Sequence, residues 1–112
     1  MEKYIDISDA MGRLGNNKKL YAMLLKKFDG IEMLEDLKNK LASGDIDGSK
    51  AQAHTIKGLA ANLSLKDLRE KAEAIELVLK NAEATDGADA SEISESAAAT
   101  QEAVETWLSE NS

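Results

Sequence analysis

The only histidine of the 112-residue chain, His54, lies in the segment AHTIKGLAANLSLKDL, with Lys57 three residues later and Gly58 four residues later. Neutral imidazole is a good nucleophile near pH 7 and can accept a phosphoryl group as a covalent intermediate. A lysine one helical turn away would offset the negative charge of that group. Glycine inside a helix costs roughly 1 kcal/mol relative to alanine, so its position beside the histidine needs a reason.

Helical periodicity predicts that this histidine faces water. One buried stripe of its helix consists of Ile46, Ala53, Ile56, Ala60 and Leu63. At 100° per residue, His54 lies about 130° from the centre of that stripe, Gly58 lies about 40° from His54, and Lys57 lies on the core-ward flank. Phosphoryl transfer needs an in-line approach by the partner's active site, which a gap in the side-chain cover permits. We therefore expect a reactive patch rather than a surface histidine without a role.

Other chemistries lack the residues that they need. A carboxylate-bridged metal site in a helical bundle uses Glu-x-x-His motifs, but position 51 is alanine and there is no second histidine. The segments GDIDG and TDGADASE lack the ligand spacing of a calcium loop. Neither a Gly-x-Ser-x-Gly turn nor a glycine-rich nucleotide loop occurs. We expect no metal, no cofactor and no kinase activity of the chain's own.

Composition predicts an all-α protein. The chain has 43% hydrophobic residues, no proline and four aromatic residues, and it is rich in alanine, leucine, lysine and glutamate. Its net charge of −7, without a basic block, argues against binding to nucleic acid. It has no cysteine, no signal-peptide pattern and no apolar stretch near the roughly 20 residues that span a bilayer. We expect one domain over residues 1–112, monomeric, soluble and cytoplasmic, without a membrane partner.

Five helical segments follow from the apolar spacing. A short turn at residues 6–15 precedes a long helix over residues 16–43 with a kink at Gly30, and further helices follow at residues 46–63 and 65–84. The stripe of the long helix consists of Leu20, Leu24, Phe28, Ile31, Leu34, Leu37 and Leu41. The apolar stripe of the helix over residues 65–84 consists of Leu65, Leu68, Ala72, Ile75 and Leu79. A loop at residues 84–96 turns at Gly87, and a last stripe contains Ile93, Ala97, Thr100, Val104 and Trp107 or Leu108. The simplest fold is an antiparallel up-down four-helix bundle with a short N-terminal capping helix.

Glu76 is a further candidate for the site. In an antiparallel bundle it should lie near the level of His54. There it would orient either Lys57 or the imidazole, or it would remain a solvated surface glutamate, which is the commoner outcome at such a position.

A stripe beside the core of the long helix also has two interpretations. It contains Lys26, Gly30, Met33 and Leu37. These residues form either a low apolar landing surface for a partner or a part of the core.

The residues around the histidine resemble the signature of histidine-containing phosphotransfer (HPt) domains. In that family, His-x-x-Lys-Gly is followed by a small residue, an Asn-apolar pair and a leucine. The segments DISDAMGRLGNNKKLYAMLLKKF and LASGDIDGSKAQAHTIKG are similar to the family's opening segment and to its approach to the histidine. The resemblance implies that His54 is the phosphorylated residue, Lys57 the cation beside the phosphate and Gly58 the clearance for a receiver domain. The family commonly has glycine where this chain has Ser64.

The resemblance also implies a place in two-component signalling. The protein would be a phosphocarrier without a nucleotide site, taking a phosphoryl group on His54 from the aspartate of one receiver domain and passing it to another. The receivers would belong to response regulators or hybrid histidine kinases, and the magnesium and acid chemistry would be theirs. The alternative is a helical module that binds receivers without phosphate turnover; the presence of both His54 and Lys57 favours the carrier.

Overall fold

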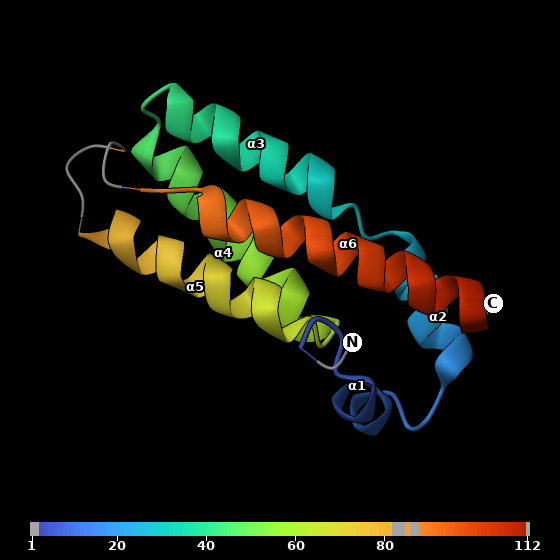
Figure 1. Cartoon of the computed structure of the whole chain (residues 1–112). Helices are drawn as coiled ribbons and strands as arrows, with labels where there is room; N and C mark the ends of the chain where they lie inside the picture. The colour runs from blue at the N-terminus through green and yellow to red at the C-terminus, as the bar shows by residue number, and fades with distance from the viewer. Residues whose placement is uncertain (1–2, 82–84, 86–87, 112) are drawn as a thin grey trace.

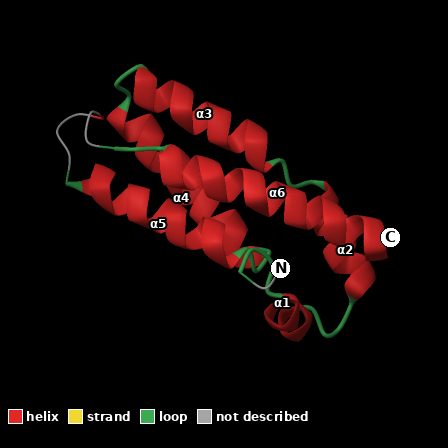
Figure 2. Cartoon of the chain, in the orientation of Figure 1, coloured by secondary structure: helices red, strands yellow, loops and turns green. Residues whose placement is uncertain are grey.

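The fold consists of helices joined by short connections. The computed structural model describes residues 3–81, 85 and 88–111, and six α-helices lie within them (Figures 1 and 2). They are α1 (Ile7–Arg13), α2 (Lys18–Lys26), α3 (Gly30–Ala42), α4 (Ile46–Asn62), α5 (Lys66–Lys80) and α6 (Ser91–Asn111).

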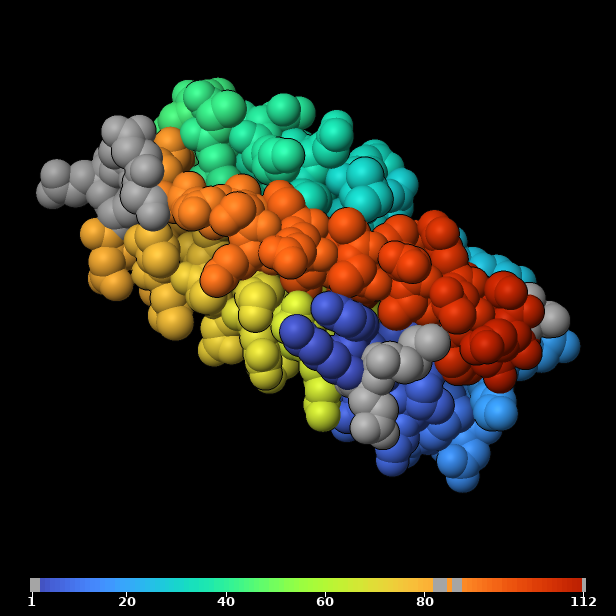
Figure 3. Space-filling model, in the orientation of Figure 1, coloured from blue at the N-terminus to red at the C-terminus, as the bar shows by residue number. Residues whose placement is uncertain are grey.

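The last four helices form an antiparallel bundle. Helix α4 packs against α3 and α5, and α6 packs against the same two helices, so α4 and α6 are diagonal to each other. Successive helices run in opposite directions, and α1 and α2 cover one end (Figure 1). Seen from the side of α6, that helix fills the surface between α3 and α5 (Figure 3). The expected all-α, up-down four-helix bundle with a short N-terminal helix is confirmed.

The periodic stripes of α4 and α5 form much of the bundle core. All five predicted residues of the α5 stripe are buried, including Leu65, Leu68 and Leu79. Ala53 and Ile56 of α4 are buried as well. Small side chains on α4 let its neighbours approach closely, because each buried alanine occupies little volume.

The long helix predicted over residues 16–43 is instead two helices. Helix α2 ends at Lys26, the buried Phe28 turns inward, and Asp29 caps the start of α3 by accepting a 3.0 Å hydrogen bond from the Glu32 amide. The break changes which residues are buried. In α2 these are Tyr21, Ala22 and Leu25, whereas Leu20 and Leu24 of the predicted stripe are exposed.

The predicted landing stripe of that helix is not one surface. Leu37 is fully buried and Gly30 is buried against Phe28; a Cβ atom on Gly30 would lie 2.7 Å from Phe28 Cζ. Met33 is half-buried, and Lys26 is exposed on the other helix. For Gly30 and Leu37 the core interpretation is therefore correct.

The segment between α5 and α6 also differs from expectation. Helix α5 ends at Lys80, four residues before the predicted end. Helix α6 begins at Ser91, inside the predicted loop, where the Asp89 carboxylate accepts a 2.9 Å hydrogen bond from the Ser91 amide. Ala84 and Gly87 lie outside the described residues.

Candidate functional site

His54 and Gly58 lie on the open face of α4. The His54 side chain is 69% exposed, as the periodicity predicts. A Cβ atom added to Gly58 would find no atom within 4 Å outside the helix's own nearby backbone. The helix that carries them is fixed at its start by Asp45, whose side chain accepts a 2.8 Å hydrogen bond from the Gly48 amide. The imidazole is therefore accessible, and the surface one turn beyond it is low.

Glu76 joins the two other polar residues of the site. Its Oε2 lies 2.9 Å from Nδ1 of His54, and its Oε1 lies 2.7 Å from Nζ of Lys57. Its side chain is only 17% exposed, because α4 and α5 pack side by side. The interpretation of Glu76 as a solvated surface residue is wrong, and it orients both Lys57 and the imidazole.

The electrostatics of this triad determine which ring nitrogen is free. The hydrogen bond from Lys57 is the largest of the effects that lower the pKa of Glu76; burial opposes it, and the hydrogen bond from His54 lowers the pKa further. Glu76 is therefore ionised near pH 7, and an ionised carboxylate can only accept hydrogen bonds. In the neutral imidazole, Nδ1 of His54 must then carry the proton, which leaves the lone pair on Nε2 of this largely exposed side chain. In this tautomer Nε2 can act as the nucleophile toward a phosphoryl group that approaches from the solvent side.

Lys57 is less accessible than the sequence suggests. It is half-buried, and its ammonium group is bound by Glu76 rather than pointing freely into water. The carboxylate neutralises its charge in this state, so a phosphate on His54 would compete with Glu76 for it. Sequence periodicity places Lys57 on the correct flank but does not show this competition.

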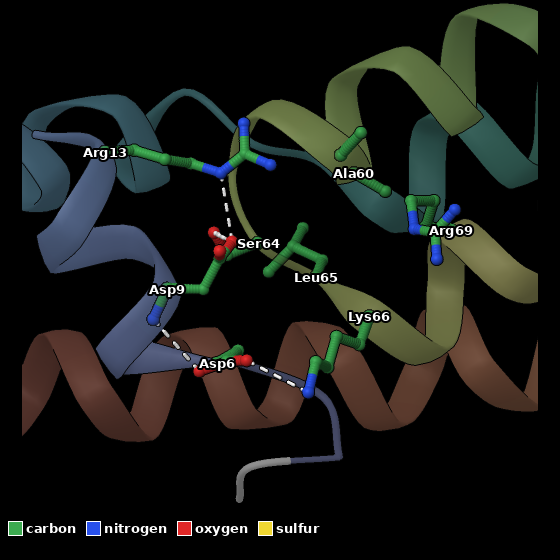
Figure 4. A pocket seen from close by; sticks show the side chains of 9 residues that line it. Asp6, Asp9, Arg13, Ala60, Ser64, Leu65, Lys66 and Arg69 are labelled. Atoms are coloured by element: carbon green, nitrogen blue, oxygen red, sulfur yellow. Dashed lines mark hydrogen bonds and ion pairs between the residues drawn. The ribbon is translucent and has the colours of Figure 1, made fainter.

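A surface cleft lies two helical turns beyond His54, between α1, the end of α4 and the start of α5 (Figure 4). Four of the charged residues that line it form ion pairs with one another. Asp9 accepts hydrogen bonds from Arg13 (3.0 Å) and from Ser64 Oγ (2.6 Å), and Lys66 lies 3.0 Å from Asp6. The bond from Ser64 is the largest of the effects that lower the pKa of Asp9. These contacts hold α1 against the α4–α5 turn.

Ser64 occupies the position where glycine is common in HPt domains. Its φ is +58°, in the left-handed region that favours glycine. Its backbone oxygen accepts a 2.9 Å hydrogen bond from the Asp6 amide, in addition to the side-chain bond to Asp9. The serine therefore adopts a backbone conformation that glycine favours, and its side chain makes a contact that glycine lacks.

No metal-binding cluster occurs in the described part of the chain, where His, Cys, Asp and Glu side chains nowhere gather in groups of three or more that could hold an ion. Over the same residues, none of the helices combines the length and the apolar character needed to cross a bilayer.

Comparisons with known proteins identify the family of the chain. The family model described as the Hpt domain matches residues 27–110. The crystal structure of the HPT domain from the Hpt sensor hybrid histidine kinase of Shewanella superposes with a TM-score of 0.76 at 18% sequence identity, covering 95% of this chain and 94% of that one. No curated protein matches the chain significantly. The chain therefore belongs to the Hpt domain family, whose members are phosphocarriers of phosphorelays and not kinases.

Proposed function

We propose that this protein carries a phosphoryl group on Nε2 of His54, accepting it from the aspartyl phosphate of one receiver domain and passing it to the aspartate of another. The observation that carries the proposal is the 2.9 Å contact between Nδ1 and Glu76. It fixes the ring with its proton on the inner nitrogen, and it leaves an unprotonated nitrogen on a face that a second protein can reach.

The transfer step balances without any further reactant. The Nε2 lone pair attacks phosphorus in line with the acyl-phosphate oxygen; the N–P bond forms, the P–O bond breaks, and the aspartate leaves as a carboxylate with the bonding electron pair. The ring keeps its Nδ1 proton and becomes cationic, and the carboxylate of Glu76 offsets that charge. Attack by the carboxylate of a second receiver reverses each change.

Lys57 and Gly58 support this step in different ways. Lys57 lies one turn from His54, bound to Glu76, and it can turn toward the phosphoryl oxygens when these arrive. Gly58 leaves the approach to the imidazole free of side-chain atoms. Positioning and access are the main contributions of a phosphocarrier, because the magnesium-assisted chemistry belongs to the receiver.

The test is His54→Gln. We expect the variant to fold normally, since the side chain is largely exposed, and to accept no phosphoryl group, since no other histidine exists. Intact-mass analysis at neutral pH after incubation with phosphoramidate, a small phosphoryl donor, measures the label. A labelled His54→Gln variant would place the acceptor elsewhere and refute the assignment.

A further inference from the structure

Five charged side chains lie within about one helical turn of the level of His54 on the two helices that form the site. They are Lys50 and Lys57 on α4 and Glu73, Glu76 and Lys80 on α5. Helix α3 packs on the other flank of α4, where the Gln52 amide donates a 3.0 Å hydrogen bond to the Met33 carbonyl oxygen. Position 52 is about 160° around the helix from position 54, so the carboxylates of α3 lie on the side of α4 away from the imidazole.

One of the five side chains contacts the imidazole ring. Glu76 Oε2 lies 2.9 Å from Nδ1, whereas Glu73 lies one turn earlier on α5 and pairs with Arg69 at 3.5 Å. Lys57 binds the other oxygen of the Glu76 carboxylate, at 2.7 Å. The charge next to the ring is therefore a carboxylate that an ammonium group partly neutralises.

The protonation of the ring decides how easily a phosphoryl group leaves it. With the phosphoryl group on Nε2 and a proton on Nδ1, the ring is cationic, and breaking the N–P bond releases neutral imidazole with the bonding electron pair. Without the Nδ1 proton, the same step would release an imidazolate anion, which is a much stronger base and a much poorer leaving group. Phosphohistidine is therefore reactive while Nδ1 holds its proton and long-lived once that proton is lost.

The Glu76 carboxylate favours the protonated ring. It accepts a hydrogen bond from a protonated Nδ1 but has no proton to donate to a bare one. A negative charge and a hydrogen bond at this distance both stabilise the charged form of a cationic group. The Glu76 side chain is only 17% exposed, so solvent screens this attraction less than it screens a surface ion pair. Lys57 opposes the effect, because its ammonium group shares the same carboxylate.

We propose that Glu76 determines the lifetime of the phosphorylated protein, because it holds the proton on Nδ1 and so keeps the phosphoryl group on Nε2 transferable above pH 7. This inference rests on the proposed function and adds a regulation of the same site. Loss of the group to water follows the same balance as transfer: an O–P bond forms, the N–P bond breaks, the ring keeps the electron pair, and the water proton goes to solvent. The phosphorylated chain is then a short-lived donor and not a store of phosphoryl groups.

The experiment follows the loss of label as a function of pH. The natural chain and Glu76→Gln are labelled with phosphoramidate, freed of the donor and held between pH 6 and pH 10, and intact mass measures the label that remains. The rate of loss should fall about tenfold per pH unit above a break, where Nδ1 loses its proton. We expect this break about one pH unit lower in Glu76→Gln, as for the loss of one adjacent charge. Above both breaks, the label of Glu76→Gln should therefore last about tenfold longer.

Two further variants test whether the carboxylate acts through the ring proton. Glu73→Gln removes a negative charge one turn away and should keep the natural break, since Glu73 pairs with Arg69. Lys57→Ala should move the break to higher pH, because the Glu76 carboxylate then acts on the ring alone. If Glu76→Gln takes too little label to be followed, the break of Lys57→Ala decides.

Three results would overturn the inference. They are a break that stays in place in the deciding variant, an equal shift in Glu73→Gln, and a rate in Glu76→Gln that changes by the same factor at every pH, as expected if Glu76 only positioned the ring. A natural chain that takes no label would refute the proposed function together with this inference. A labelled natural chain with an unmoved break in Glu76→Gln would refute this inference alone.

Discussion

A single carboxylate accepts hydrogen bonds from two side chains at the site. Glu76 holds Nδ1 of His54 and the ammonium of Lys57 with different oxygens, at 2.9 and 2.7 Å. The first contact fixes the ring tautomer, and the second places a positive charge beside the ring. The lowered pKa of Glu76 keeps the carboxylate ionised near pH 7, so both of its oxygens accept and its charge pairs with Lys57.

Glu76→Gln should slow transfer from a receiver without abolishing it. The amide oxygen can still accept the Nδ1 proton, but it cannot offset the charge of the phosphorylated ring, and it releases Lys57. We expect a loss of roughly tenfold in single-turnover rate, equivalent to about 1.4 kcal/mol of activation free energy. Glu73→Gln, one turn earlier on α5 and paired with Arg69, is the control and should transfer at the natural rate. An unchanged rate in Glu76→Gln would mean that the triad does not assist the chemistry.

The effect of Glu76→Gln on the free energy of unfolding should depend on pH. The pKa of Glu76 in the folded protein is lowered from its usual 4.5, so its contacts stabilise the fold above about pH 4.5 and are lost as pH falls through the folded pKa. The difference in unfolding free energy between the natural chain and Glu76→Gln should therefore be larger at pH 7 than at pH 3. Urea denaturation at both values measures it, and a constant difference would contradict the ion-pair interpretation.

At the scale of one helix, Gly58 lowers the stability of the fold but leaves His54 accessible to a receiver. Gly58→Ala should raise the unfolding free energy by roughly 0.5 to 1 kcal/mol, because the backbone is helical and the added methyl group meets no other side chain. Gly58→Leu should also fold but should transfer poorly, since its side chain would stand between the imidazole and a receiver. Urea denaturation and single-turnover transfer measure the two effects. Transfer by Gly58→Leu at the natural rate would remove the access argument.

The turn between α4 and α5 offers a second test at the scale of elements. Ser64 combines an unfavourable left-handed φ with a hydrogen bond to Asp9 that anchors α1. Ser64→Ala keeps the strain and loses the bond, whereas Ser64→Gly loses both. We expect the alanine variant to be less stable than the natural chain, and less stable than the glycine variant by roughly 1 kcal/mol, the backbone cost of a left-handed alanine. Equal stability of the two variants in urea would show that the turn is not strained.

The break between α2 and α3 shows where periodicity misleads. Leu20, Leu24 and Ile31 continue one helical stripe on paper, yet all three are exposed. The sequence does indicate a second helix here, because Asp29 followed three residues later by Glu32 is the pattern of a helix start. Apolar spacing alone cannot distinguish one long helix from two whose faces differ, since it assumes a continuous axis.

At the scale of the whole molecule, the bundle could be predicted and the triad only in part. The stripe of α5 is regular because the helix faces the same neighbours along its length, so all five of its predicted residues are buried. In the stripe predicted for α4, Ala53, Ile56, Ala60 and Leu63 are buried, whereas Ile46 is only half-buried. An antiparallel arrangement also places Glu76 at the level of His54. Whether its carboxylate reaches both His54 and Lys57 depends on ångström-scale helix packing, which the spacing of residues does not determine.

Trp107 tests whether the N-terminal helices and the bundle unfold together. It is the only tryptophan, it is buried on α6, and its ring meets Tyr21 of α2 edge-on. Trp107→Ala should lower the unfolding free energy by about 3 to 5 kcal/mol, because a large buried ring is replaced by a cavity at the junction of the two parts. If the two parts unfold together, tryptophan fluorescence and helical circular dichroism of the natural chain should change at the same urea concentration. Trp107 reports the junction, whereas the dichroism reports all helices. An earlier fluorescence transition, or a loss under 1 kcal/mol in Trp107→Ala, would show that α2 separates from a bundle that remains folded without it.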